Sequence, residues 1–156
     1  MVETPRLVLL EPLDGKATIA QAWNTFTNID DDFNAWGLNN EGMATKKTSI
    51  EIRNLYGNIL RTLKIYKLSL DDLDNLCLTQ SQIIEFCEKY PEELGQEDMT
   101  LFLFKENNTY FVAYVDMVSG KLDIHVLSLY HKIIRASWWH HLVLQQLKES
   151  DQKEKK

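Results

Sequence analysis

The segment from Thr100 to Leu129 constrains the fold most, because it holds three apolar runs separated by two tight-turn signals. Asn107-Asn108 separates the first two runs, and Ser119-Gly120 separates the second from the third. Dipeptides of this kind favour the turns that join neighbouring antiparallel strands. The segment therefore predicts three antiparallel strands, and its many Phe and Tyr residues predict a sheet rich in aromatic rings.

Two helix starts are predicted upstream of these strands. Ser69 is followed three residues later by Asp72, and Thr79 by Gln82, and each pair matches a reciprocal N-terminal capping box. Apolar residues at helical spacing follow each pair, up to Pro91. We therefore expect two consecutive short helices, the second of which is ended by Pro91 and Gly95.

The segment 49–67 carries a helical pattern with one weak point. Six apolar or aromatic side chains fall on one arc of a helical wheel: Ile52, Leu55, Tyr56, Ile59, Leu63 and Tyr66. Gly57 lowers helix stability by about 1 kcal/mol relative to Ala. Because Ile50 and Ile52 also alternate, a hairpin turning at Tyr56-Gly57-Asn58 is the alternative. We favour the helix, with Arg53, Arg61 and Lys64 on a common flank.

The two ends of the chain give weaker patterns. Arg6–Leu10 predicts a short first strand or extended arm, and a helix is predicted from Thr18 to about Asn28. Tyr130–Leu147 fits either a helix or a bend followed by a last strand at His141–Leu144. Residues 148–156 are nearly all charged or polar and are expected to be disordered.

These elements predict one α+β domain over residues 1–147, followed by a charged tail. In this fold, N-terminal helices pack on a three- to four-stranded antiparallel sheet formed by the C-terminal half. The chain has 156 residues, of which 44% are hydrophobic and 26% charged, as in ordinary globular domains.

Composition also bears on the compartment. No apolar run approaches the roughly 20 residues needed to cross a bilayer, and the first residues lack the pattern of a signal peptide. Cys77 and Cys87 both fall in apolar stretches, which favours buried thiols over a disulfide. We therefore expect a cytoplasmic protein with no membrane partner.

Charge is unevenly distributed along the chain. The net charge is −6, which disfavours a general nucleic-acid coat. Residues 46–67 nevertheless carry six basic and one acidic side chain, whereas residues 68–99 carry one basic and nine acidic side chains. The basic segment either pairs with these acids or forms a binding face, so a nucleic-acid-associated protein is the alternative functional hypothesis. We expect the intramolecular pairing to prevail.

Several stretches resemble a group of small uncharacterised bacterial proteins. The resemblance rests on Leu76–Gln80 as a capped helix start, on the strands Thr100–Lys105 and Phe111–Val115, and on the acidic stretch Asp30–Gly37. It spans most of residues 10–147. The group usually has proline where this chain has Gln145, and it favours a strand over a helix for residues 141–145. It implies no activity, cofactor or site residue.

Metal and cofactor sites are not predicted. Asp30, Asp32, Asn34 and Glu41 have the spacing of calcium-loop ligands, but Ala35 replaces the glycine that the sharp turn requires. The acidic stretch is therefore interpreted as a solvated face beside core aromatics. Adjacent histidines at 140 and 141 would point to opposite faces of a strand, so they cannot share a zinc ion.

Catalytic signatures are also lacking. Cys87 lies on an apolar stripe, where a thiol is a core group and not a nucleophile. The sequence contains no nucleophile elbow, phosphate loop or dinucleotide fingerprint. A small hydrolase is therefore the third hypothesis, and we expect a protein that is not an enzyme.

The stretch Arg135–His141 has the composition of a protein interface. Paired tryptophans on a strand point to opposite faces, and we expect Trp138 to point inward with Leu142 and Leu144. That leaves Trp139 outward beside Arg135 and His141, as in an interface hot spot. The leading functional hypothesis is a non-enzymatic interaction or regulatory module that binds another protein or itself. Its surface would be the aromatic face and C-terminal edge of the sheet.

Overall fold

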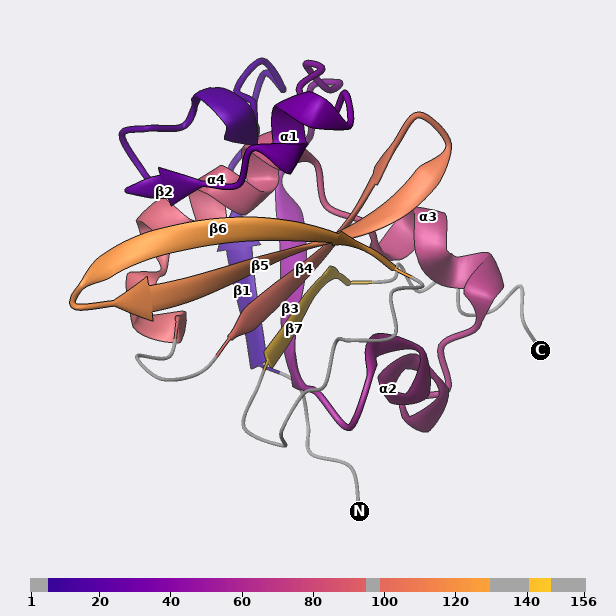
Figure 1. The fold of residues 1–156 in the computed structure, drawn as a ribbon. Helices are drawn as coiled ribbons and strands as arrows, with labels where there is room; N and C mark the ends of the chain where they lie inside the picture. Colours follow the sequence, from indigo (N-terminus) through magenta and orange to yellow (C-terminus); the bar gives the residue numbers. More distant parts are fainter. Residues whose placement is uncertain (1–5, 95–98, 130–140, 147–156) are drawn as a thin grey trace.

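A mixed sheet of seven strands organises the part of the chain that the computed structural model describes, residues 6–94, 99–129 and 141–146 (Figure 1). The strands lie in the order β1-β3-β7-β4-β5-β6-β2. Their bounds are β1 Arg6–Leu10, β2 Asn28–Ile29, β3 Thr48–Asn54, β4 Thr100–Glu106, β5 Thr109–Val118, β6 Lys121–Ser128 and β7 His141–Gln145. The α-helices are α1 Asp32–Ala35, α2 Ile59–Ile65, α3 Leu73–Leu76 and α4 Gln80–Lys89, with 3₁₀ turns at Ile19–Gln21, Leu70–Asp72 and Pro91–Glu93.

The predicted three-stranded meander is confirmed. β4 pairs with β5 and β5 with β6, both antiparallel. Asn107 and Asn108 have φ of 52° and 61°, and Ser119 and Gly120 have φ of 52° and 77°. Two consecutive residues with positive φ are the geometry of the turn whose twist suits a two-residue hairpin. Local turn chemistry therefore determines this half of the sheet.

The predicted architecture of helices on a small antiparallel sheet is wrong. β1 pairs antiparallel with β3, and β3 antiparallel with β7. β7 then runs parallel to β4, and β2 parallel to β6, so the sheet is mixed. The N-terminal half was expected to contribute only helices packed over the sheet. It also contributes three strands to the sheet, β1, β2 and β3. The reason is that β1 and β3 bury apolar residues by pairing with distant strands.

The helix predicted over residues 49–67 is also wrong in its first half. Residues Thr48–Asn54 form β3, and the chain then turns at Gly57, whose φ is +77°. The side chain of Asn58 accepts a hydrogen bond from the backbone N–H of Arg61 (2.8 Å) and so begins α2. The segment is thus a strand followed by a helix, and not the alternative hairpin.

The helix predicted from Thr18 is wrong as well. Only a single 3₁₀ turn, Ile19–Gln21, forms there, and residues 28–29 are a strand. Ile19 and Phe26 are buried, as their spacing suggested, but Trp23 is 61% exposed. The four residues at helical spacing, which are Ile19, Ala22, Trp23 and Phe26, were too few to define a helix without a continuous buried stripe.

Both predicted capping boxes are confirmed. The side chain of Gln82 accepts from the backbone N–H of Thr79 (2.9 Å), and Thr79 Oγ1 accepts from the backbone N–H of Gln82 (3.1 Å). The carboxylate of Asp72 accepts from the backbone N–H of Ser69 (2.7 Å). These bonds satisfy backbone donors that the first turn of a helix leaves without partners.

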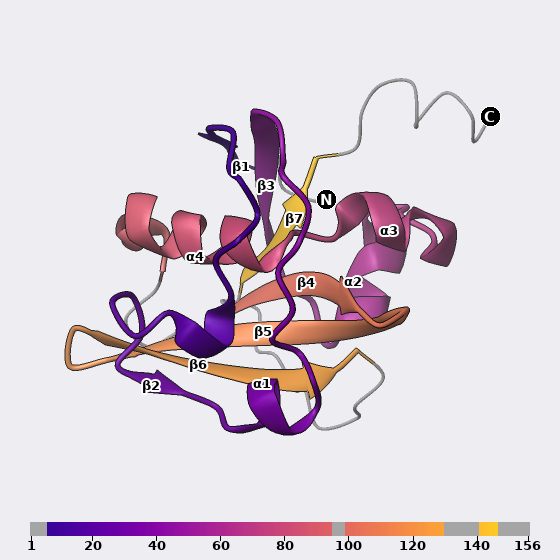
Figure 2. The ribbon, with the colours of Figure 1, turned by 90° about the horizontal axis from the view of Figure 1, so that it is seen from above.

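Each face of the sheet carries its own layer, with α4 on one side and α2 and α3 on the other (Figure 2). On the first face, Phe102, Phe104 and Val143 pack against α4 residues such as Phe86. On the second face, Leu142 and Leu144 pack with residues of α2 and α3. β7 lies between β3 and β4, and both of its faces are buried because helices cover both sides.

The last strand is confirmed at His141–Gln145, in agreement with one of the two expected structures for this region. The predicted domain end at residue 147, the charged tail and both tryptophans of the 138–139 pair lie outside the described residues. In residues 6–94, 99–129 and 141–146, no helix has the length and apolar character needed to span a membrane.

Candidate functional site

Two leucines on the outermost strand are exposed on the same face of the sheet. β1 is an edge strand, and Leu7 and Leu9 are 53% and 43% exposed. Val8 packs against the first core cluster and Leu10 belongs to it, so Leu7 and Leu9 point to the opposite face. On that opposite face, α2 and α3 cover the inner strands of the sheet. Neither leucine belongs to the core cluster that forms beneath these helices. The covering layer ends before it reaches β1.

The outer edge of β1 is partly occupied by the molecule itself. The carbonyl of Ser49, which lies opposite Leu9, accepts from the backbone N–H of Gln146 (2.9 Å). Ser49 therefore directs its backbone groups toward β7, and Leu9 directs its own out of the sheet. The hydroxyl of Tyr90 donates to the carbonyl of Leu9 (2.5 Å), and Lys89 Nζ lies 3.5 Å from the same oxygen. These contacts protect the edge against a further strand.

Charged side chains surround the two leucines. Arg53 donates to Glu51 (2.7 Å), which lies opposite Leu7, whereas Arg6 points to the other face of β1 and pairs with Glu93 (2.7 Å). Lys47 and Lys89 are exposed, and no ion pair involves either of them within the described ranges. Glu11, just beyond the strand, is an exposed carboxylate. The surroundings of the leucines are therefore weakly cationic, in a chain whose net charge is −6.

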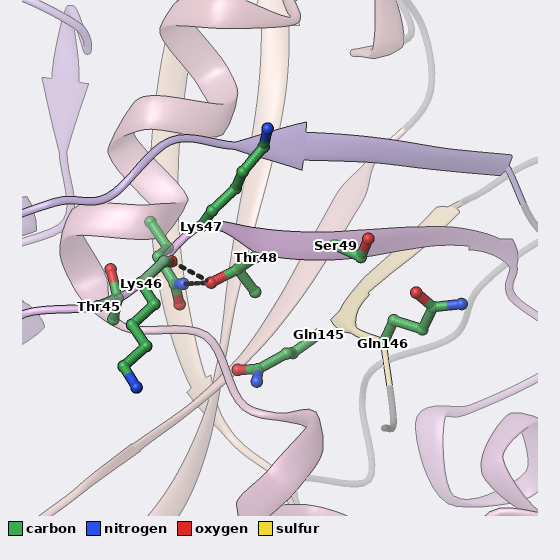
Figure 3. A pocket seen from close by; sticks show the side chains of 8 residues that line it. Thr45, Lys46, Lys47, Thr48, Ser49, Gln145 and Gln146 are labelled. Carbon is green, nitrogen blue, oxygen red and sulfur yellow. Dashed lines mark hydrogen bonds between the residues drawn. The ribbon is translucent and has the colours of Figure 1, made fainter. Parts of the chain in front are cut away.

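A polar pocket of about 440 Å³ opens where β3 begins and β7 ends (Figure 3). Eight residues from three segments line it: Thr45, Lys46, Lys47, Thr48, Ser49, Gln82, Gln145 and Gln146. Figure 3 shows Lys46 and Gln145 extending to one side of β3 and Lys47 to the opposite side. None of the eight carries a carboxylate, so the pocket presents ammonium, hydroxyl and amide groups.

Part of this pocket is held in place by hydrogen bonds. The hydroxyl of Thr48 donates to the carbonyl of Lys46 (2.6 Å) and accepts from the side-chain amide of Gln82 (3.2 Å). Gln82 is fixed in turn by its capping bond to Thr79. By contrast, the side chains of Lys46 and Gln145 form no hydrogen bond or ion pair within the described ranges.

The basic residues predicted as a binding flank are separated by the fold. Arg53 lies on β3, and its guanidinium lies 4.4 Å from the ring centre of Tyr66 besides pairing with Glu51. Arg61 and Lys64 lie one helical turn apart on α2 and are exposed. The common flank does not form, because Gly57 ends the continuous helix that it required. The partner of Arg53 is also on its own strand, and not in the acidic segment 68–99.

Of the residues predicted around the tryptophan pair, only His141 can be placed. It begins β7, between Asn54 of β3 and Thr100 of β4, and it is half-buried. Arg135 and Trp139 lie outside the described residues. The aromatic face expected to be exposed is mostly interior, since Phe102 and Phe104 are 0% and 1% exposed.

Asp30, in the acidic stretch, links the start of α1 to β6 through hydrogen bonds. Its carboxylate accepts from the backbone N–H groups of Asp32 (3.0 Å) and Val126 (3.3 Å), which ties the start of α1 to β6. His125 lies between Asp30 (4.0 Å) and Asp116 (3.8 Å) and stacks on Tyr114. Burial and these two carboxylates raise the pKa of Tyr114. No group of three or more potential ligands that could hold a metal ion occurs in the described residues.

Both cysteines are free thiols, as predicted. Cys87 is buried inside the first core cluster, and burial raises the pKa of its thiol. Burial, with a smaller effect of Asp74, raises the pKa of Cys77 to about 12. Both groups therefore remain protonated near neutral pH, which is unfavourable for a nucleophile.

The sequence analysis missed both the exposed leucines and the pocket. Leu7 and Leu9 were part of the predicted first strand, but their exposure depends on how far a helical layer extends. The pocket combines residues 45–49 with Gln82 and the end of β7, and no local pattern joins these segments. The one available signal was the pair Lys46-Lys47 in a run without acids up to Ser49.

No protein-family model matches this chain, and no curated protein or solved structure matches it at a significant level.

Proposed function

We propose that this protein is a non-enzymatic interaction module that binds another protein through the outward face of β1. The observation that supports this most is the exposure of Leu7 and Leu9, 53% and 43%, side by side on one face of an edge strand. Single exposed leucines are ordinary, but adjacent ones on one face form an apolar surface that association can bury.

The partner docks on the face of β1, and not on its hydrogen-bonding edge. Tyr90 and Lys89 already occupy the carbonyl of Leu9, and the bridge between Arg6 and Glu93 lies beside it. Adding a strand would require breaking these contacts. The leucine side chains, in contrast, are available without rearrangement.

The charges around the leucines indicate the chemistry of the partner. Lys47 and Lys89, which form no ion pair within the described residues, favour a protein surface on which apolar side chains are flanked by carboxylates. A second copy docked symmetrically on the same face would bring these cations against one another, which is unfavourable. A different protein is therefore the proposed partner.

The cytoplasm is the proposed compartment. Two free thiols, one of them in the core, support it, because reduced cysteines persist in reducing compartments.

Photo-crosslinking tests the proposed surface. Leu7 is replaced by p-benzoylphenylalanine, and Val118 is replaced in a matched control, because the two positions are 53% and 55% exposed on different strands. Each full-length protein is irradiated in an extract of the source organism. We expect a discrete protein adduct from position 7 only, and we expect Leu9→Asp to suppress it, since a carboxylate placed among the apolar contacts disrupts them.

The proposal fails if position 7 gives no adduct, if position 118 gives the same one, or if Leu9→Asp leaves the yield unchanged. Analytical ultracentrifugation separates the two kinds of partner. A dimer that Leu9→Asp dissociates would assign the surface to self-association instead.

A further inference from the structure

We propose that the polar pocket between β3, β7 and α4 binds a small phosphorylated polyol. This inference is independent of the proposed protein-binding surface, because it depends on Lys46, Gln145 and their neighbours and on neither leucine (Figure 3).

The charge of the pocket selects an anion. Lys46 contributes an ammonium group on the side of β3 to which Gln145 extends, whereas Lys47 extends to the opposite side, and no carboxylate is among the eight described lining residues. The closest acid along β3, Glu51, is occupied by Arg53 (2.7 Å). In a chain of net charge −6, the pocket is therefore a local region where an anion is attracted and not repelled.

The uncharged groups of the pocket match hydroxyls. Thr48 contributes a hydroxyl group, and Gln82, Gln145 and Gln146 contribute amides. Hydroxyls and amides both donate and accept hydrogen bonds, as the hydroxyls of a polyol do. No aromatic side chain is present among these residues to stack on a base or a flat ring.

The size of the pocket also favours an extended ligand. A volume of about 440 Å³ exceeds what inorganic phosphate occupies and lies in the range of small-molecule sites. Lysine acts as a point charge toward a phosphate, so Lys46 would hold the phosphoryl group while the glutamines contact the rest of the ligand.

Some groups of the pocket are fixed in advance, which lowers the entropic cost of binding. Thr48 is held between Lys46 and Gln82, and Gln82 is held by its bond to Thr79. The side chains of Lys46, which precedes β3, and Gln145, which ends β7, extend to the same side of β3, so they can close on a ligand from two segments of the chain (Figure 3).

The test is a titration of the isotopically labelled full-length protein with glucose 6-phosphate, followed by NMR at low ionic strength. Glucose, inorganic phosphate and gluconate are the matched comparison ligands. We expect saturable shifts of the backbone amides of residues 45–49 and 145–146, with glucose 6-phosphate binding more tightly than any of the other three. Lys46→Gln should weaken binding about fivefold, because it removes the ammonium charge, and Gln145→Ala about threefold, because it removes a hydrogen-bonding amide.

Two variants control for other effects. Lys121→Gln, on the distant β6, removes the same charge and should leave the affinity unchanged, as should Leu9→Asp on the proposed protein-binding face. Shifts that do not saturate, or that Lys46→Gln and Lys121→Gln reduce equally, would overturn the proposal. Equal affinity for inorganic phosphate and glucose 6-phosphate would overturn the polyol assignment, and tighter binding of gluconate would overturn the assignment of the phosphoryl group.

Discussion

The second face of the sheet is covered over β7 and β4 and uncovered over β1, although leucines occur in both regions. Leu142 and Leu144 are 0% exposed beneath α2 and α3, whereas Leu7 and Leu9 are 53% and 43% exposed. The residue types are the same, and so is the alternation along the strands. The difference comes from the covering layer, which ends before it reaches β1. An apolar residue on a strand is therefore core or binding surface according to what packs over it.

The largest expected effect contrasts the two regions directly. Leu142→Ala should lower the free energy of unfolding by about 2–5 kcal/mol, because it creates a cavity under the helices. Leu7→Ala should change it by less than about 0.5 kcal/mol, since this side chain is largely in solvent. Urea unfolding of both variants gives the comparison. A loss of several kcal/mol in Leu7→Ala would mean that β1 belongs to the covered region.

The second effect concerns the turn that places the covering layer. Gly57 has φ of +77°, and a Cβ atom there would lie 3.1 Å from Cδ of Arg61. Gly57→Ala should therefore destabilise the protein by about 1–2 kcal/mol. Gly120→Ala is the matched control, because Gly120 has the same φ but nothing within 4 Å of the added carbon. If unfolding in urea shows the Gly57 variant to be the less affected of the two, the close contact with Arg61 has no energetic role.

The third effect is a pH dependence at the contact between α2 and β3. Burial, followed by the neighbouring Tyr56, raises the pKa of Tyr66 from 10.0 to about 12. Because the folded state holds the proton more tightly, this stabilisation is complete below pH 10 and is lost as the pH rises toward 12. The free energy of unfolding should fall more steeply over this range in the wild type than in Tyr66→Phe. Parallel pH profiles for the two proteins would contradict the raised pKa.

The smallest effect concerns Thr45, one of the residues that line the pocket. The hydroxyl of Thr45 is buried and has no hydrogen-bond partner within residues 6–94, 99–129 and 141–146. Thr45→Val removes this group and keeps the shape, so it should stabilise the protein by about 1 kcal/mol or less. A lower midpoint of thermal unfolding in this variant would show that the hydroxyl is satisfied in solution.

The elements that could be predicted are those with a local cause. Asn107-Asn108 and Ser119-Gly120 determine the two hairpin turns, and the pairs Ser69–Asp72 and Thr79–Gln82 determine two helix starts. Each signal lies within four residues of the structure that it specifies. The meander and the two short helices were therefore predicted correctly.

The elements that were predicted wrongly depend on pairing between strands that are far apart in the sequence. Ile52 fits a helical arc as well as a strand, and the choice is made by pairing of β3 with β1 and with β7, which is about 90 residues away in the sequence. The pocket and the exposed leucines follow from that arrangement, so no local pattern could reveal either. Gly57 was identified as the weak point of the predicted helix, and the chain turns there from β3 into α2.

The most direct test of the central claim is the rate of maleimide labelling at position 9. The native thiols should react slowly, because Cys87 is buried, Cys77 is partly buried and burial raises the pKa of both, so Leu9→Cys can be followed against a low background. The account predicts fast labelling in the purified protein and labelling about tenfold slower in a desalted extract of the source organism, where the partner covers the surface. Val118→Cys should react equally fast in both. Slow labelling of Leu9→Cys in the purified protein, or equally fast labelling in the extract, would contradict the account.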